Sequence, residues 1–123
     1  MSRGQLPNRI RRGDVVWVED PFDFETQQDD TTSDHPYLII STEEHPFQGT
    51  EYLAMLVTTT DRPAAISIAD SEWTYGSLSR SSHISPWTVV TLKDRDIAEY
   101  QGQVTSDVVD TAVRRLPPYI GLS

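Results

Sequence analysis

The chain has 123 residues and a formal net charge of −9, and it contains no cysteine. This length predicts one domain with a single modest core, and the lack of cysteine excludes disulfides, thiolate metal sites and a thiol nucleophile. No apolar run approaches the roughly 18 residues that cross a bilayer, and the first residues lack a signal-peptide core. We therefore expect a cytoplasmic protein without a membrane segment.

Lysine is nearly absent from the chain. Acidic residues outnumber basic ones by 19 to 10, and Lys93 is the one lysine. Such acidic, lysine-poor surfaces are typical of a very salty cytosol, where self-repulsion is screened within about 3 Å at 1 M ionic strength. We hypothesise a halophilic host, with an ordinary acidic protein as the alternative.

Residues 1–12 form a basic arm ahead of a predicted single domain at residues 13–123. The arm holds four of the ten basic residues and no acidic one, which leaves a net charge of −13 for the rest of the chain. An arm of this kind can contact a phosphate backbone or an acidic partner, and a solvated flexible leader is the alternative.

Most of the predicted elements are short strands. Residues 15–19 alternate and are rich in β-formers, residues 37–41 are almost wholly apolar, and residues 51–60 form a long strand with an apolar centre. The stretch 21–36 has two aromatic and five acidic residues and no regular period; loops of that length are usually functional or disordered. Further strands are predicted at 64–70, 76–86 and 87–92, with a separator at 71–76, and a strand or returning turn at 94–104.

One helix is predicted, at residues 105–116. Thr105 or Ser106 can cap it, Asp107 favours its positive end, and the two arginines of "RRL" favour its negative end. The Pro-Pro pair that follows is expected to end it. Many short strands with one terminal helix predict a mainly β fold, a small and strongly bent β-barrel. The apolar stripe of the helix comprises Val108, Val109, Ala112, Val113 and Leu116.

The common metal and nucleotide signatures are missing from the sequence. There is no HExxH, P-loop or GxGxxG motif, and the three histidines do not lie at ligand spacing within any one element, so we expect no metal and no cofactor. Ser82 and His83 are neighbours that should point to opposite faces of a strand, whereas Ser81 and His83 share a face. Without a GxSxG elbow we expect no acyl-transfer triad, and a polar sheet face is the alternative role of this stretch.

Several short motifs follow one another along the chain: "RRGDVVWV", a polar loop, "HPYLIIS", "LAMLVTTT", a weak "GQV" and finally "TSDVVDTAVRRL". Their order resembles that of the MazF/PemK family of toxin–antitoxin ribonucleases. The likeness covers about residues 11–120. It implies an SH3-like barrel of five to seven strands with a C-terminal helix, usually a homodimer. It also implies metal-independent cleavage of single-stranded RNA and a cognate antitoxin as partner.

In the resembled family, cleavage centres on an arginine before proline and on a threonine that ends the aliphatic strand. The threonine corresponds to Thr58, but the arginine position holds His35. Arginine binds phosphate well through two parallel N–H donors but is a poor base. Histidine lacks this pair of donors but can transfer protons at neutral pH. We predict His35 and Thr58 as catalytic residues. The predicted RNA-binding residues are Arg12, Thr59, Arg62, Arg80, Ser82, His83, Phe22 and Phe24.

Aromatic residues are further candidates for RNA contacts. Trp17, Phe22, Phe24 and Trp87 could stack unpaired bases, an interaction that is less salt-sensitive than phosphate pairing, and core or interface packing is the alternative. The loop at 21–34 is expected to cover the site. The histidine at position 35 leaves a catalytically silent binding or regulatory module as the alternative function. A gyrase-poisoning relative on the same fold is a third.

Overall fold

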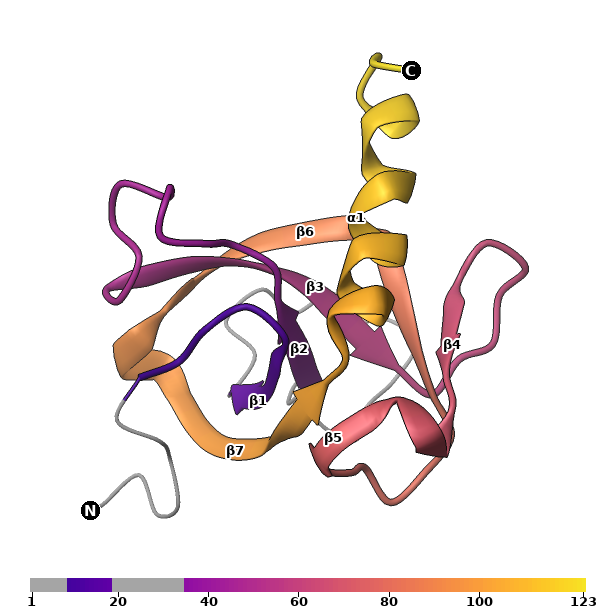
Figure 1. The fold of residues 1–123 in the computed structure, drawn as a ribbon, viewed down its shortest axis with the longest axis horizontal. Coiled ribbons are helices and arrows are strands. Elements are labelled where there is room, and N and C mark those ends of the chain that lie inside the picture. Colours follow the sequence, from indigo (N-terminus) through magenta and orange to yellow (C-terminus); the bar gives the residue numbers. More distant parts are fainter. Residues whose placement is uncertain (1–8, 19–34) are drawn as a thin grey trace, which may run out of the picture.

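The computed structural model describes residues 9–18 and 35–123. These residues form a seven-stranded sheet in which all strand pairs are antiparallel, with the order β4-β6-β3-β2-β1-β7-β5. The sheet curls into a half-barrel, and α1 lies across one side of it (Figure 1). The strands are β1 Asp14–Val18, β2 His35–Ile39, β3 Glu51–Thr58, β4 Ile66–Ile68, β5 Trp73–Gly76, β6 Ser82–Lys93 and β7 Ile97–Val104; the helices are the 3-10 turns η1 Asp70–Glu72 and η2 Asp94–Asp96, and α1 Ser106–Tyr119.

The predicted fold class is confirmed: the protein is mainly β, with a strongly bent sheet and one C-terminal helix. Of the predicted arm, residues 1–8 lie outside the described residues. The part that is described contacts the domain, because Ile10 is buried in the core. No helix in the described part of the chain is long and apolar enough to cross a membrane.

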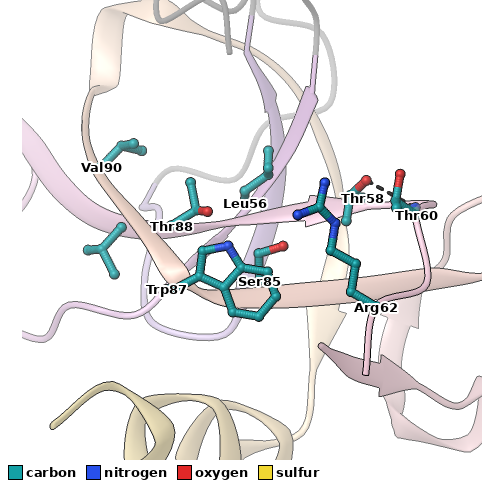
Figure 2. Close-up of a pocket in the computed structure, with 9 residues that line it drawn as sticks. Leu56, Thr58, Thr60, Arg62, Ser85, Trp87, Thr88 and Val90 are labelled. Atoms are coloured by element: carbon teal, nitrogen blue, oxygen red, sulfur yellow. Dashed lines mark hydrogen bonds between the residues drawn. The ribbon is translucent and has the colours of Figure 1, made fainter. Parts of the chain in front are cut away.

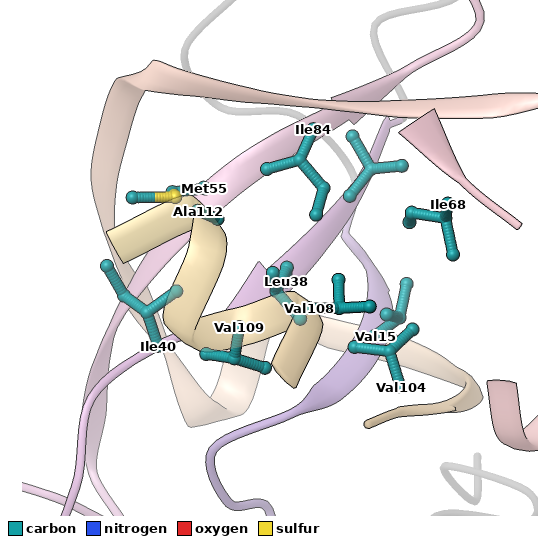
Figure 3. Packing of buried hydrophobic residues seen from close by; sticks show 11 residues of the cluster. Val15, Leu38, Ile40, Met55, Ile68, Ile84, Val104, Val108, Val109 and Ala112 are labelled. Atoms are coloured by element: carbon teal, nitrogen blue, oxygen red, sulfur yellow. The ribbon is translucent and has the colours of Figure 1, made fainter. Parts of the chain in front are cut away.

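The central strands are apolar on both faces because both faces are covered. Leu38 and Met55 face α1, whereas Tyr37 and Leu56 belong to a second cluster on the opposite face of the sheet. Figure 3 shows the first cluster, in which Val109 and its helical neighbours lie against the sheet. The predicted stripe of α1 is confirmed, since its five residues are buried in this cluster or packed against it.

Two predicted boundaries in the sheet are wrong. Residues 82–93 form one continuous strand, β6, rather than two strands that meet at residues 86 and 87. The prediction split them at Pro86, but a proline is tolerated where the strand bulges and no ladder hydrogen bond is needed. The segment 71–76, predicted as a separator, contains β5, which pairs with β7 at an edge of the sheet.

The helix is longer than predicted. Thr105 caps it by accepting a hydrogen bond from the backbone of Val108, but α1 continues to Tyr119 through both prolines. Proline suits helical φ, and near a C-terminus the loss of donors costs less than in a helix interior. The arginines at 114 and 115 therefore lie before the last turn, which has no basic residue, so their predicted place at the negative end is wrong.

Candidate functional site

A cavity of about 390 Å³ opens on the sheet where β3 and β6 lie side by side. Figure 2 shows its lining, with Trp87 at its centre and Arg62 reaching toward the end of β3. Hydroxyl groups, one guanidinium and one indole make up its polar groups, and no acidic residue is among the lining residues that the structure describes. The lining residues are Leu56, Thr58, Thr60, Arg62, Ser85, Trp87, Thr88, Val89 and Val90.

A bulge in β6 creates this cavity. Consecutive residues of β3, Met55 and Leu56, pair with Val89 and Ser85, so the three residues between the last two have no partner on β3. Such an insertion bends a strand and redirects its side chains. Trp87, at the middle of the bulge, is 38% exposed and makes an edge contact with Tyr119 of α1, with ring centroids 6.4 Å apart.

Thr58 ends β3 at the rim of the cavity. Its hydroxyl oxygen accepts a hydrogen bond of 3.1 Å from the backbone N–H of Thr60, which holds the side chain in place. Thr58 is half-buried and points to the same face of the sheet as Leu56, away from α1. A threonine there presents its hydroxyl to anything bound in the cavity.

Two histidines flank Thr58 in the sheet. His83 of β6 is directly opposite Thr58. On the other side, β2 pairs with β3 through Tyr37 and Leu56, and the same antiparallel register continued by two residues brings His35 opposite Thr58. Residues directly opposite each other in antiparallel strands point to the same face. The catalytic residues predicted from the sequence thus stand on neighbouring strands, each two residues beyond the Tyr37–Leu56 pair, and His83 lies opposite Thr58.

His83 is held by two neighbours. Its Nδ1 lies 3.1 Å from Oγ of Ser67, the residue opposite it on β4, and 4.0 Å from Oδ1 of Asp61 in the loop that follows β3. The His83 side chain is only 10% exposed, whereas that of Asp61 is 82% exposed. Both contacts involve the same ring nitrogen, and the described residues offer Nε2 no hydrogen-bond partner.

Arg62 supplies the positive charge of the cavity. It is exposed, and among the described residues no carboxylate forms a salt bridge with it. Arg80, another of the predicted RNA-binding arginines, is also exposed but does not line the cavity. An uncompensated guanidinium beside hydroxyl donors suits a phosphate group.

Several predicted RNA-binding residues lie outside this cavity. Arg12 sits beyond the far end of the β1–β2 pair, where its guanidinium donates to Asp110 of α1 at 2.8 Å. That hydrogen bond lowers the pKa of the exposed Asp110 carboxyl. Ser82 is buried, on the opposite face from His83, and donates to the backbone oxygen of Arg80. Thr59 is exposed next to the cavity, while Phe22 and Phe24 lie outside the described residues.

The sequence interpretation missed several residues of the site. Ser67 and Asp61 gave no signal, because nothing local shows that β4 pairs with β6. Ser85 and Thr88 gave no signal either, because their place in the lining depends on the bulge of β6. Trp87 was recognised only as a stacking candidate among four aromatics. Across the described residues, no three His, Cys, Asp or Glu side chains are grouped so as to hold a metal ion.

The fold is shared with several solved structures. MazF from Deinococcus radiodurans matches with a TM-score of 0.70 at 18% identity, over 94% of this chain and 100% of that one. An endoribonuclease from a mycobacterial species matches with a TM-score of 0.67 at 21% identity, over 96% and 97% of the two chains. A mycobacterial endoribonuclease in complex with its cognate antitoxin matches with a TM-score of 0.68 at 19% identity, over 95% and 98%. At these identities the likeness establishes the fold.

Family membership comes from the sequence itself. Residues 11–119 match the PemK-like, MazF-like toxins of type II toxin–antitoxin systems, so the chain belongs to this family. The resemblance inferred from short motifs is thereby confirmed. No curated protein matches the sequence. The comparisons give no support to a halophilic host, which stays a hypothesis.

Proposed function

We propose that the protein is an endoribonuclease toxin that cleaves single-stranded RNA without a metal ion. The observation that carries the proposal is the position of Thr58, which lies between two histidines and faces a cavity that holds the uncompensated Arg62. Family membership supports it, and two of the similar folds are named endoribonucleases. The reaction site would be the phosphate that sits against Thr58.

The cleavage is an internal transfer. The ribose 2′-oxygen bonds to the neighbouring phosphorus, the bond from phosphorus to the 5′-oxygen breaks, and the products are a 2′,3′-cyclic phosphate and a 5′-hydroxyl. His35 takes the proton of the 2′-hydroxyl, since an imidazole nitrogen can accept a proton at neutral pH and an arginine cannot. Thr58 and Arg62 stabilise the negative charge that builds on the phosphate oxygens.

The substrate must be single-stranded for this geometry to work. Trp87 stands half exposed in the lining of the cavity and offers a face on which an unpaired base can stack. Stacking depends little on salt, whereas phosphate pairing weakens as salt rises. A net charge of −9 opposes RNA binding at long range, so a local aromatic and cationic site has to supply the affinity.

The test is incubation of the purified protein with a long RNA in molar KCl and EDTA. We expect cutting, with cyclic phosphate ends. His35→Ala should slow cutting by about 10²- to 10⁴-fold, the usual worth of a general base. Thr58→Ala should slow it by about 10²- to 10³-fold, as for one lost donor to a charged intermediate. The matched control is Thr91→Ala, which alters an exposed threonine of β6 outside the cavity.

Intact RNA with the wild-type protein would refute the nuclease, and cutting by His35→Ala at the wild-type rate would refute the role of His35. Growth arrest with intact RNA but broken DNA would instead indicate a gyrase poison. The first outcome thus tests the nuclease activity, and the second tests only the role of His35 in it.

The second candidate is a catalytically silent binding module retained for its antitoxin, favoured by the histidine at position 35. His35→Arg distinguishes the two: a large gain in cutting means that the histidine marks lost activity. For either function we propose a homodimer that binds a cognate antitoxin, as the similar mycobacterial endoribonuclease was crystallised with its own. Light scattering on the purified protein should give twice the chain mass of 13.9 kDa.

A further inference from the structure

We propose that His83 is the general acid of this cleavage and donates a proton to the departing 5′-oxygen, while Ser67 and Asp61 position its ring. The inference rests on the proposed function, because it assigns the second proton transfer of the same reaction. Cleavage by 2′-hydroxyl attack needs a base for the attacking oxygen and an acid for the leaving one, and the role given to His35 supplies only the base.

The placement of the three side chains fits an in-line displacement. His35 and His83 lie on opposite sides of Thr58, each one strand away, on the same face of the sheet. Adjacent strands are about 4.8 Å apart, so the two histidines stand on strands separated by about 10 Å. A phosphate centred over Thr58 would present its attacking oxygen to one histidine and its leaving oxygen to the other.

The contacts of His83 leave its Nε2 available for proton transfer. Ser67 Oγ and Asp61 Oδ1 are both near Nδ1, so the proton on that nitrogen is the one they accept. Nε2 is then the nitrogen that transfers a proton, and no partner among the described residues occupies it. After the transfer His83 is a neutral ring that keeps its Nδ1 proton, and the 5′-hydroxyl leaves uncharged.

The surroundings of His83 also favour the acid role. A general acid must donate from a fixed nitrogen, and Asp61 Oδ1 at 4.0 Å and Ser67 Oγ at 3.1 Å both lie at Nδ1, which leaves Nε2 to face the phosphate. Burial keeps the ring in one orientation, since only a tenth of the side chain is exposed. Ser67 and Asp61 do not reach the phosphate in this arrangement, so they are positioning residues.

A substrate with a better leaving group tests this role directly. Once a cleavage site has been mapped in the long RNA, a short RNA with that site is made in two forms, one with oxygen and one with sulfur as the 5′ leaving atom. A thiolate departs without being protonated, so it needs no acid. His83→Ala should slow cutting of the oxygen substrate by about 10²- to 10⁴-fold and that of the sulfur substrate by less than about tenfold. His35→Ala should slow both equally.

Exposed residues provide variants that do not endanger the core. Asp61→Asn and Ser67→Ala should lower kcat on the oxygen substrate several-fold, leave KM unchanged and spare the sulfur substrate. Ser71→Ala, an exposed serine of η1, is the matched control and should change nothing. His83→Asn keeps a donor near Ser67 while removing Nε2, and it should behave as His83→Ala does if the chain is folded by circular dichroism.

The results separate this inference from the proposed function. If the wild-type protein cuts neither substrate, the nuclease itself is refuted. If the wild-type protein cuts RNA and the His83 variants cut the oxygen substrate equally fast, only the acid role is refuted. Equal loss on both substrates also refutes it, because it means that His83 serves binding, structure or the attacking oxygen.

Discussion

Asp14 carries a carboxylate that is only 1% exposed at the start of β1. Its Oδ2 accepts a hydrogen bond from the backbone N–H of Arg11, and its Oδ1 accepts one each from the Tyr100 hydroxyl and the Gln103 amide. Burial raises the pKa of Asp14 above its usual 3.8, although these hydrogen bonds oppose the rise. Burial of the Tyr100 hydroxyl, together with the Asp14 carboxylate beside it, raises the pKa of Tyr100 to about 12.

The raised pKa of Asp14 makes stability depend on pH in a predictable direction. The folded chain holds this proton more tightly than the unfolded chain, so the contribution of Asp14 to the free energy of unfolding falls as pH rises from 3.8 to its raised folded value. Urea unfolding across this range should show the difference between wild type and Asp14→Asn falling with pH.

Asp110→Asn is the control of opposite sign. Its lowered pKa means that its stabilising contribution is present above 3.8 and is lost as pH falls through the lowered value. The difference between wild type and Asp110→Asn should therefore rise with pH. A pH-independent difference for Asp14→Asn would contradict the raised pKa.

At the scale of elements, α1 depends on its first turn. The Thr105 side chain accepts a hydrogen bond of 3.4 Å from the Val108 N–H, which also donates to the Thr105 backbone oxygen at 3.1 Å. Thr105→Ala should lower the free energy of unfolding by about 1 kcal/mol, as measured by urea unfolding. Thr111→Ala, at an exposed mid-helix site, should have no cost, because alanine is the better helix former. Equal effects of the two variants would mean that the cap contributes nothing.

The bulge of β6 shows where element prediction failed and why this mattered for the site. Pro86 reads locally as a strand end, yet Ser85 and Val89 both pair with β3. Pairing on both sides of the bulge keeps the strand continuous. After Thr88 the side chains of β6 again alternate regularly between the two faces of the sheet. The cavity and the outward position of Trp87 follow from the bulge.

At the scale of the whole molecule, charge sets the expected response to salt. The chain has a net charge of −9, and its one lysine, Lys93, is paired with Glu51 at 3.0 Å. If the protein is adapted to high salt, the melting temperature should rise between about 0.2 and 2 M KCl as self-repulsion is screened. A variant with Glu44→Gln and Asp96→Asn, which removes two exposed charges, should show a smaller rise. A melting temperature that stays level in the wild type would refute the hypothesis.

The sequence by itself determined the family, the mainly β class and the capped helix, because these depend on local order: apolar runs, their spacing and a threonine before an amphipathic segment. It also predicted His35 and Thr58 as catalytic residues, because both stand at the ends of recognisable strands. Only the tertiary structure decided that His83 lies opposite Thr58, that Ser67 and Asp61 lie near its Nδ1, and that Arg62 rather than Arg12 lines the cavity with Thr58. The physical reason is strand register. Which residues face one another across β2, β3, β6 and β4 depends on how distant strands pair and on a bulge in β6. No local stretch of the sequence specifies either of these features.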